Sequence, residues 1–176
     1  MKPLIPIILV LFLAPVRARA DDTKVKIYGP YSELEAYVTD FLKPISKTRV
    51  YKKRLAFALQ LIPSIITHAK LQGIDPLLVA VMISFESSWD FTAVGKLGER
   101  GLMQTHGRAV NGFDMADPVQ QVAAGCAHLA RALEFCKGDI PGALSRYGTG
   151  GGCRPLARFV KWRLRAYKRA VKRYRK

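Results

Sequence analysis

The segment from residue 75 to residue 86 constrains the fold of this chain more than any other. It opens with Asp75-Pro76, and an aspartate N-cap followed by proline at the first helical position is a strong helix start. The residues that follow are apolar on all sides of a helix: Leu77, Leu78, Ala80, Val81, Met82 and Ile83. A helix without a polar face has to be enclosed by other elements. The sequence therefore predicts a compact domain built around one buried helix.

The rest of the chain supports a mainly α fold in a single domain. Its 176 residues suit one domain, and 49% of them are hydrophobic, which is enough for a sizeable core. Periodicity and start signals predict further helices over about residues 32–42, 51–71, 118–135 and 140–147. Pro63 lies inside the second of these and is expected to kink or divide it. Alternation typical of strands is absent, although residues 91–97 are expected to allow a short β-hairpin.

The first twenty residues have the features of a secretory signal peptide. Lys2 supplies the positive start, an uncharged and largely apolar stretch runs from Leu4 to Val16, and Ala18-Arg19-Ala20 is a small-x-small cleavage site. The apolar stretch is too short to cross a bilayer as a helix, although an uncleaved membrane anchor is the alternative. We therefore expect an exported protein, either periplasmic or secreted.

The chain is strongly basic, with a formal net charge of +16. Removing residues 1–20 lowers this charge to +13, because that segment contains three basic residues and no acidic one. A protein with such a charge binds polyanions. Since export makes nucleic acid an unlikely partner, the bacterial cell wall and anionic lipid are the expected polyanions, and the protein itself is expected to be a monomer.

Three cysteines follow the signal segment: Cys126, Cys136 and Cys153. Export favours a disulfide, and the odd number leaves one thiol over. If the helix over 140–147 returns antiparallel to the helix over 118–135, Cys153 comes close to Cys126. We therefore expect a Cys126–Cys153 disulfide, with Cys136–Cys153 as the alternative pair. Three buried, reduced thiols are the remaining interpretation.

Glu86 is the strongest candidate for a catalytic residue. It lies at the end of the apolar helix, where burial would disfavour the charged carboxylate, raise its pKa and suit it to act as a general acid. Most enzymes that cleave glycosidic bonds add a second carboxylate. The nearby candidates are Asp90, Glu99, Asp114 and Asp117, and nothing in the sequence marks any of them as that second acid.

Three motifs at fixed spacing give the chain a specific resemblance. They are Phe85-Glu86-Ser87-Ser88-Trp89, then Gly101-Leu102-Met103-Gln104, and finally Ala143-Leu144-Ser145-Arg146-Tyr147-Gly148-Thr149-Gly150. Over residues 74–152 this pattern resembles the catalytic domain of the soluble lytic transglycosylases, which have a lysozyme-like (SLT-type) fold and cut the glycan of peptidoglycan. The resemblance implies cleavage of the β-1,4 bond between N-acetylmuramic acid and N-acetylglucosamine by one glutamate, leaving 1,6-anhydro ends.

The resemblance also assigns roles to individual residues. Glu86 would be the acid and then the base. Gly101 would let the backbone approach the cleft, Met103 would line an apolar wall beside Glu86, and Gln104 would bind the sugar. Tyr147 would hold the acid in place through its hydroxyl. No cofactor or metal is implied, and His68, His106 and His128 lack the spacing of metal ligands.

The sequence departs from the family pattern at three positions. Gly148 stands where the family usually has Asn, and Gly95 stands where it often has the Ser that orients the N-acetyl group. Gln121 replaces an expected Asn, a change expected to affect packing only. The change at Gly95 keeps simple hydrolysis by a muramidase open as an alternative. Together with Gly148 it also keeps open a non-catalytic module that binds the wall.

The last stretch, residues 153–176, is predicted to be a basic amphipathic tail that follows a helical segment at 21–73 and the motif-bearing domain at 74–152. From Arg154 onward it contains eleven Lys or Arg and no acid, with apolar residues on one helix face. This pattern is typical of an element that binds an anionic membrane or lipopolysaccharide. The alternative is a helix whose apolar face packs on the domain. A tail that binds membranes also leaves open a different function, that of a cationic protein that disrupts membranes through residues 154–176. The small size and basic tail fit a phage lysis protein (endolysin) or a space-making enzyme of a secretion system.

Overall fold

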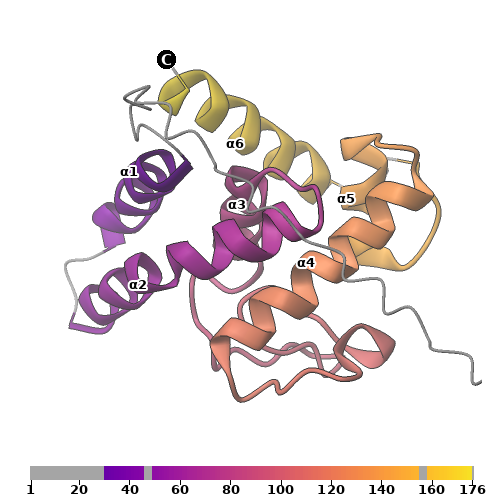
Figure 1. The fold of residues 1–176 in the computed structure, drawn as a ribbon, viewed down its shortest axis with the longest axis horizontal. Coiled ribbons are helices and arrows are strands. Elements are labelled where there is room, and N and C mark those ends of the chain that lie inside the picture. The colour runs from indigo at the N-terminus through magenta and orange to yellow at the C-terminus, as the bar shows by residue number, and fades with distance from the viewer. Residues whose placement is uncertain (1–29, 46–48, 155–157, 176) are drawn as a thin grey trace, which may run out of the picture.

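The computed structural model describes residues 30–45, 49–154 and 158–175, so the predicted signal peptide lies outside the described residues. These residues form six α-helices and two short 3-10 helices, with no strand among them (Figure 1). In chain order they are α1 (Pro30–Leu42), η1 (Lys43–Ile45), α2 (Arg49–Leu71), α3 (Pro76–Glu86), η2 (Gly107–Val110), α4 (Pro118–Phe135), α5 (Ile140–Thr149) and α6 (Arg158–Tyr174). The prediction of a mainly α fold is confirmed.

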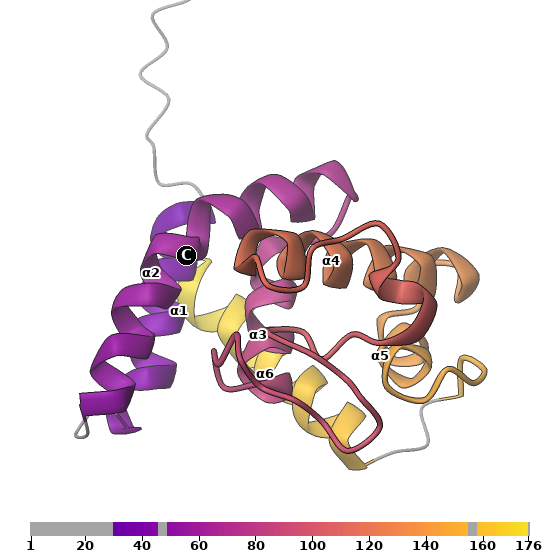
Figure 2. The same ribbon diagram turned by 90° about the horizontal axis from the view of Figure 1, so that it is seen from below.

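Helix α3 lies in the middle of the molecule, as Figures 1 and 2 both show. Every residue from Pro76 to Ser84 is buried, and α1, α2 and α6 all pack against the helix. At its start the Asp75 carboxylate accepts a hydrogen bond of 3.0 Å from the amide of Leu77. This cap satisfies one of the free amides of the first turn. The predicted buried helix is therefore the centre of the core.

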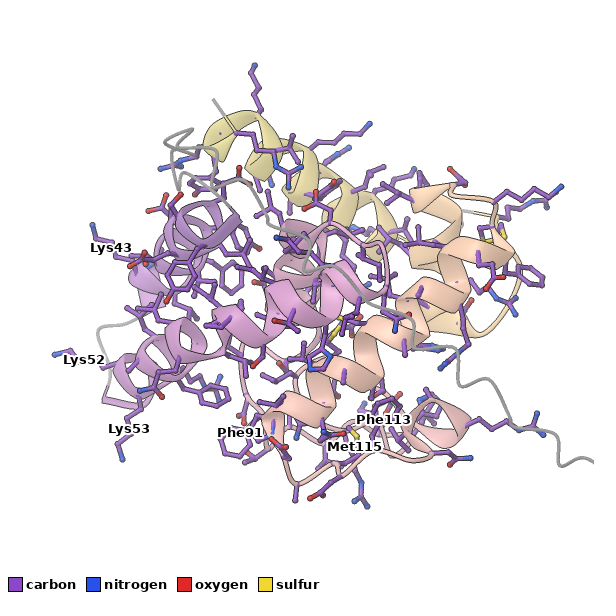
Figure 3. The ribbon with its side chains drawn as sticks, viewed as in Figure 1. Lys43, Lys52, Lys53, Phe91, Phe113 and Met115 are labelled. Carbon is purple, nitrogen blue, oxygen red and sulfur yellow. A yellow bond between two sulfur atoms is a disulfide. The ribbon has the colours of Figure 1, made fainter. Side chains whose placement is uncertain are left out.

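Helix α2 packs against α1, α3 and α4, and it runs through Pro63 without being divided there. Its buried side chains include Ala58, Ile62 and Ile65. In Figure 3, Lys43, Lys52 and Lys53 project outward at the end of the molecule where α1 and α2 meet. Within the described residues no single helix is long and apolar enough to cross a membrane; residues 52–71 and 76–86 pass that test only as a pair bent by 119°.

A long loop joins α3 to α4 and contains no regular strand. Its only β-type pairings are isolated bridges of Arg100 with Val94 and with Thr105, so the short hairpin expected over residues 91–97 does not form as regular strands. Phe91 anchors the loop by packing on Phe57 of α2, with 5.1 Å between the centroids of the two rings. Figure 3 shows Phe91 and Met115 together at the base of this loop, next to the start of α4.

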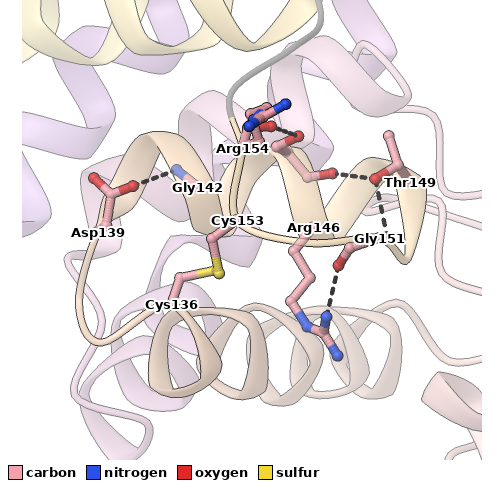
Figure 4. Close-up of a disulfide and its surroundings, with 9 residues drawn as sticks. Cys136, Asp139, Gly142, Arg146, Thr149, Gly151, Cys153 and Arg154 are labelled. Carbon is pink, nitrogen blue, oxygen red and sulfur yellow. Dashed lines mark hydrogen bonds between the residues drawn. A yellow bond between two sulfur atoms is a disulfide. The ribbon is translucent and has the colours of Figure 1, made fainter.

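The disulfide joins Cys136 to Cys153, so the favoured pairing of Cys126 with Cys153 was wrong and the alternative pair forms (Figure 4). After α5 the chain turns at Gly150 and runs back along that helix, which places the backbone oxygen of Cys153 next to Gly142. This return brings Cys153 to Cys136 at the end of α4. Cys126 lies ten residues earlier on α4, about 15 Å along the helix, and stays a buried free thiol.

Helix α6 packs its apolar face on the domain, which is the second of the two interpretations of the basic tail. Val160 and Ala170 are buried against the core. The hydroxyl of Tyr167 donates to the Asp75 carboxylate at the start of α3, and that of Tyr174 donates to Asp40 on α1 at 2.7 Å. The opposite face remains exposed and basic, with Arg158, Lys161, Arg165, Lys168, Arg169, Lys172 and Arg173. The helix is therefore a structural part of the domain.

Candidate active site

Glu86 is the last residue of α3 and faces a cleft of about 970 Å³. Its side chain is only 14% exposed. The helix stops here because Ser87 caps it and because the next residues, Ser88 and Trp89, have positive φ angles. The Ser87 hydroxyl donates to the backbone oxygen of Leu102 at 2.9 Å, which ties the end of α3 to the floor of the cleft. Glu86 is thus a partly buried acid on a rigid helix end.

Arg163 of α6 forms an ion pair with Glu86. Its Nη2 lies 2.8 Å from Oε1 of the acid, and its own side chain is 11% exposed. Burial raises the pKa of Glu86, and this effect outweighs the opposing effect of Arg163, which lowers the pKa. The charge of Glu99 raises it further by a smaller amount. A carboxyl group with a raised pKa is suited to donate a proton near neutral pH.

The segment from Gly101 to Gln104 forms the floor next to Glu86. Gln104 lines the cleft, and its amide nitrogen donates to the backbone oxygens of Gly101 at 2.8 Å and of Ala93 at 3.2 Å. Gly101 itself is buried and has a φ of +70°, and a Cβ there would lie 2.2 Å from the side-chain oxygen of Gln121. Gly101 therefore does not line the cleft. It lies beneath the floor, where its lack of a side chain lets Gln121 of α4 pack against the backbone.

Gln121 on α4 holds this floor, a role that the sequence did not reveal. Its oxygen accepts a hydrogen bond of 2.9 Å from the amide of Leu102, and its nitrogen donates to the backbone oxygens of Phe91 and Met115 at the same distance. Gln121 is 2% exposed, and these three bonds give both polar atoms of its buried side chain hydrogen-bond partners. The helix start at Asp117-Pro118 was visible in the sequence. The loop amides that Gln121 binds were not, because they depend on the path of the loop.

A hydrogen bond links Tyr147 to Met103, and Tyr147 also interacts electrostatically with Glu86. The Tyr147 hydroxyl donates at 2.6 Å to the backbone oxygen of Met103, which lies in the segment next to Glu86. Burial raises the pKa of Tyr147 well above its usual value, so the phenol stays neutral. Met103 is fully buried and lies against Gly125 of α4. Tyr147 thus lines the cleft, while Met103 lies beneath it and does not form the wall that was predicted.

A buried hydroxyl network supports α3 behind the acid. Ser84 donates to the backbone oxygen of Ala80 at 2.8 Å, and it accepts hydrogen bonds from Trp89 at 3.0 Å and from Tyr37 of α1 at 3.1 Å. Trp89 is fully buried, so the turn after Glu86 is anchored in the core. Asp90 at the end of this turn pairs with Arg54 of α2. These contacts fix the backbone on both sides of Glu86.

The lining of the cleft is rich in basic side chains. Lys96, Arg108 and Arg131 line it, together with His106 and His128. The centroids of the His128 and Tyr147 rings lie 4.7 Å apart. Burial lowers the pKa of His128. Among the described residues, no three His, Cys, Asp or Glu side chains come together in a way that could hold a metal ion. The cleft therefore combines one buried acid with polar groups suited to a sugar chain.

The comparison with known families supports this geometry. The model of the transglycosylase SLT domain matches residues 63–169, which is more than half of the chain. The chain belongs to the SLT transglycosylase family. This membership agrees with the lysozyme-like, mainly helical fold and with an enzyme that acts on the glycosidic bonds of peptidoglycan at the cell wall. The match extends on both sides of residues 74–152 and includes most of α6, the helix that carries Arg163.

Proposed function

We propose that this SLT-family protein is a lytic transglycosylase that cuts the β-1,4 bond between N-acetylmuramic acid and N-acetylglucosamine. Glu86 is its acid and base. One observation carries the proposal: a partly buried carboxyl group with a raised pKa lies in a cleft of about 970 Å³, at the glutamate that the family motif marks. The sugar chain is the substrate, and export past the inner membrane is the expected route to it.

In this reaction Glu86 first gives its proton to the glycosidic oxygen, and the bond from that oxygen to C1 of the muramic acid breaks. The electron pair of the bond goes to the departing oxygen, which becomes a hydroxyl group. The 6-hydroxyl of the same muramic acid then attacks C1 and gives its proton to Glu86, which forms the 1,6-anhydro ring. Arg163 supports this cycle because it pairs with the carboxylate that exists between the two proton transfers.

Gln104 and Tyr147 position the substrate and the floor beneath it. Gln104 lines the cleft, and its side-chain nitrogen donates to the backbone. Its side-chain oxygen is therefore the atom that accepts a hydrogen bond from the sugar. Tyr147 presents its ring to the cleft while its hydroxyl fixes the backbone at Met103. We assign Gln104 to substrate binding and Tyr147 to positioning.

Release of soluble fragments from dye-labelled peptidoglycan tests the enzyme assignment. Glu86→Gln keeps the size of the side chain and removes its proton, so we expect a loss of at least about a hundredfold in rate. Glu35→Gln, on the exposed face of α1, is the control for a lost carboxylate and should match the parent protein. Equal rates for Glu86→Gln and the parent would contradict the assignment.

Two rival readings of the same cleft give different results. A muramidase would lose activity in Glu86→Gln in the same way but would release products with a reducing end. A non-catalytic module, which Gly95 and Gly148 favour, would bind peptidoglycan in both variants and release nothing from either. Phage lysis and the opening of the wall for a secretion system remain the two roles that suit a small, basic enzyme of this kind.

The exposed face of α6 supports a second candidate function, the attachment of the enzyme to an anionic surface. Lys161, Arg165 and Lys168 are exposed there, and Trp162 is 49% exposed between them. Changing these three basic residues to Glu should reduce binding to vesicles that contain phosphatidylglycerol, while the activity on isolated peptidoglycan remains. Unchanged vesicle binding would contradict this role. The buried residues of α6 are left intact, so folding is preserved.

A further inference from the structure

Glu99 and Gly95 fit together on the floor of the cleft. A Cβ built on Gly95 would lie 2.2 Å from Oε2 of Glu99 and 3.0 Å from the side-chain oxygen of Gln104. The backbone at Gly95 is not in the left-handed region, so it would accept any L-residue. The Glu99 carboxylate occupies the space that a side chain at position 95 would enter. A side chain at position 95 would therefore displace the Glu99 carboxylate from its present position.

The carboxylate of Glu99 is held in this position by the turn that carries it. Its Oε2 accepts a hydrogen bond of 2.9 Å from the amide of Leu97, and the amide of Gly95 donates to the Glu99 backbone oxygen at 2.8 Å. The side chain lines the same cleft as Glu86, and the two carboxyl groups interact electrostatically. Glu99 is thus a fixed, partly exposed negative charge in the cleft that contains the acid.

One polar group in this part of the cleft, the Thr105 hydroxyl, lacks a hydrogen-bond partner. The hydroxyl of Thr105 is buried, with the residue 2% exposed, and it makes no hydrogen bond in the structure. Thr105 lines the cleft and is bridged to the residue after Glu99. Its amide donates to the backbone oxygen of Arg100 at 3.2 Å, and the Arg100 amide donates to the backbone oxygen of Thr105 at 3.0 Å. A buried hydroxyl without a partner is costly, so a ligand group is expected to satisfy it.

We propose that Glu99 is a second catalytic carboxylate, which stabilises the positive charge that develops on the muramic acid ring when Glu86 protonates the glycosidic oxygen. This inference rests on the proposed substrate. As the bond breaks, its electrons leave with the departing oxygen and the positive charge remains on C1, the ring oxygen and the N-acetyl group. An ionised carboxylate beside Gln104 stabilises that charge by electrostatics alone. Glu99 exchanges no proton, and the step needs no further reactant.

The surroundings of the two glutamates suit these different tasks. Glu86 is enclosed, whereas Glu99 accepts hydrogen bonds from the backbone, chiefly its own amide and that of Leu97, which lower its pKa and keep it ionised. Two carboxyl groups whose environments separate their pKa values are the usual sign of an acid and a charged partner.

Glu99→Gln tests the role, because glutamine keeps an oxygen for the Leu97 amide and removes only the charge. We expect kcat on peptidoglycan to fall at least about tenfold while KM changes by less than about twofold. Glu35→Gln is the matched control and should change neither value. A kcat within twofold of the parent protein would overturn the proposal.

A binding measurement separates this inference from the proposed function. The probes are chitotetraose and the same oligosaccharide with a protonated iminosugar at the cleavage position. The parent protein should prefer the cationic probe, and Glu99→Gln should reduce this preference at least about tenfold. If the preference is unchanged, the role of Glu99 is wrong whatever the substrate. If the parent protein prefers the cation but releases nothing from peptidoglycan, the proposed function fails and the catalytic role fails with it, and Glu99 is only part of a site that binds a cationic sugar.

Gly95 supplies an independent test through a double-mutant cycle. Gly95→Ala places a methyl group where the Glu99 carboxylate lies, so it should lower kcat several-fold in the parent protein. In a Glu99→Ala background the carboxylate is gone and the Gln104 oxygen remains 3.0 Å from the methyl position, so the same change should lower kcat clearly less than in the parent protein. An equal loss in both backgrounds would show that Gly95 acts without Glu99 and would contradict the proposal.

Discussion

Arg163 of α6 lies 2.8 Å from the carboxylate of Glu86, and neither side chain is more than 14% exposed. The pair joins the C-terminal helix to the end of the central helix across 77 positions of the sequence. The last helix is therefore part of the site. Any change that loosens α6 is expected to alter the chemistry of Glu86 as well as the stability of the domain.

Replacing Arg163 should move the pH profile of the enzyme. Arg163 lowers the pKa of Glu86, so Arg163→Met removes this effect and raises that pKa further. The acid must be protonated to start the reaction, and activity is lost as pH rises through its pKa. The alkaline limb of kcat/KM against pH should therefore shift to higher pH. Arg165→Met, exposed on the same helix, should leave the limb in place. A shift to lower pH would contradict this account.

Gln121→Leu should weaken the floor of the cleft. The change leaves the amide of Leu102 and two backbone oxygens without their buried partner, at a cost of about 1–3 kcal/mol in the free energy of unfolding. Denaturant unfolding measures this cost, and hydrogen exchange at Leu102 should become faster. Gln120→Leu, the neighbouring residue on α4, is the control. Equal stability of the two variants would rule out a supporting role for Gln121.

Tyr147→Phe removes the buried hydrogen bond from the tyrosine hydroxyl to the backbone oxygen of Met103. We expect the free energy of unfolding to fall by about 1 kcal/mol or more, because the acceptor loses its partner. We also expect kcat to fall while the pKa seen in the pH profile remains, since the hydroxyl binds the floor and not Glu86. A shifted pH profile would instead indicate a direct effect on the acid.

The disulfide should stabilise the domain, and Cys126 should not take part in it. Cys153→Ser opens a link across 17 positions, which should lower the free energy of unfolding by about 3 kcal/mol. In the parent protein, alkylation followed by mass spectrometry should label Cys126 alone, and only after unfolding, because this thiol is buried. Labelling of Cys136 in the unreduced protein would contradict the pairing.

The central helix could be predicted from the sequence because its signals are local. The cap at Asp75, the proline after it and the continuous apolar run all act within one helix, and Glu86 follows directly. The pairing of Cys153 could not be predicted in the same way. It depends on the return of the chain along α5 after Gly150, and the helix pattern alone suggested that the chain would continue toward Cys126.

The contacts of the site also could not be predicted from the sequence, because they depend on how distant segments pack together. Arg163 was one of eleven basic residues in the tail, and only the packing of α6 selects it as the partner of Glu86. Glu99 was one of the candidates for a second acid. That its carboxylate lies over Gly95 became visible only in the folded turn that carries both residues. The sequence revealed the types of residue needed for the chemistry, and tertiary packing determined which of them meet.

Mass spectrometry of the fragments released from purified peptidoglycan tests the central claim most directly. The chain without residues 1–20 should release fragments ending in 1,6-anhydro-muramic acid, and these should disappear with Glu86→Gln. Fragments heavier by one water, with a reducing end, would contradict the transglycosylase reaction and establish hydrolysis by the same acid. Fragments that persist in Glu86→Gln would contradict the role of Glu86 itself.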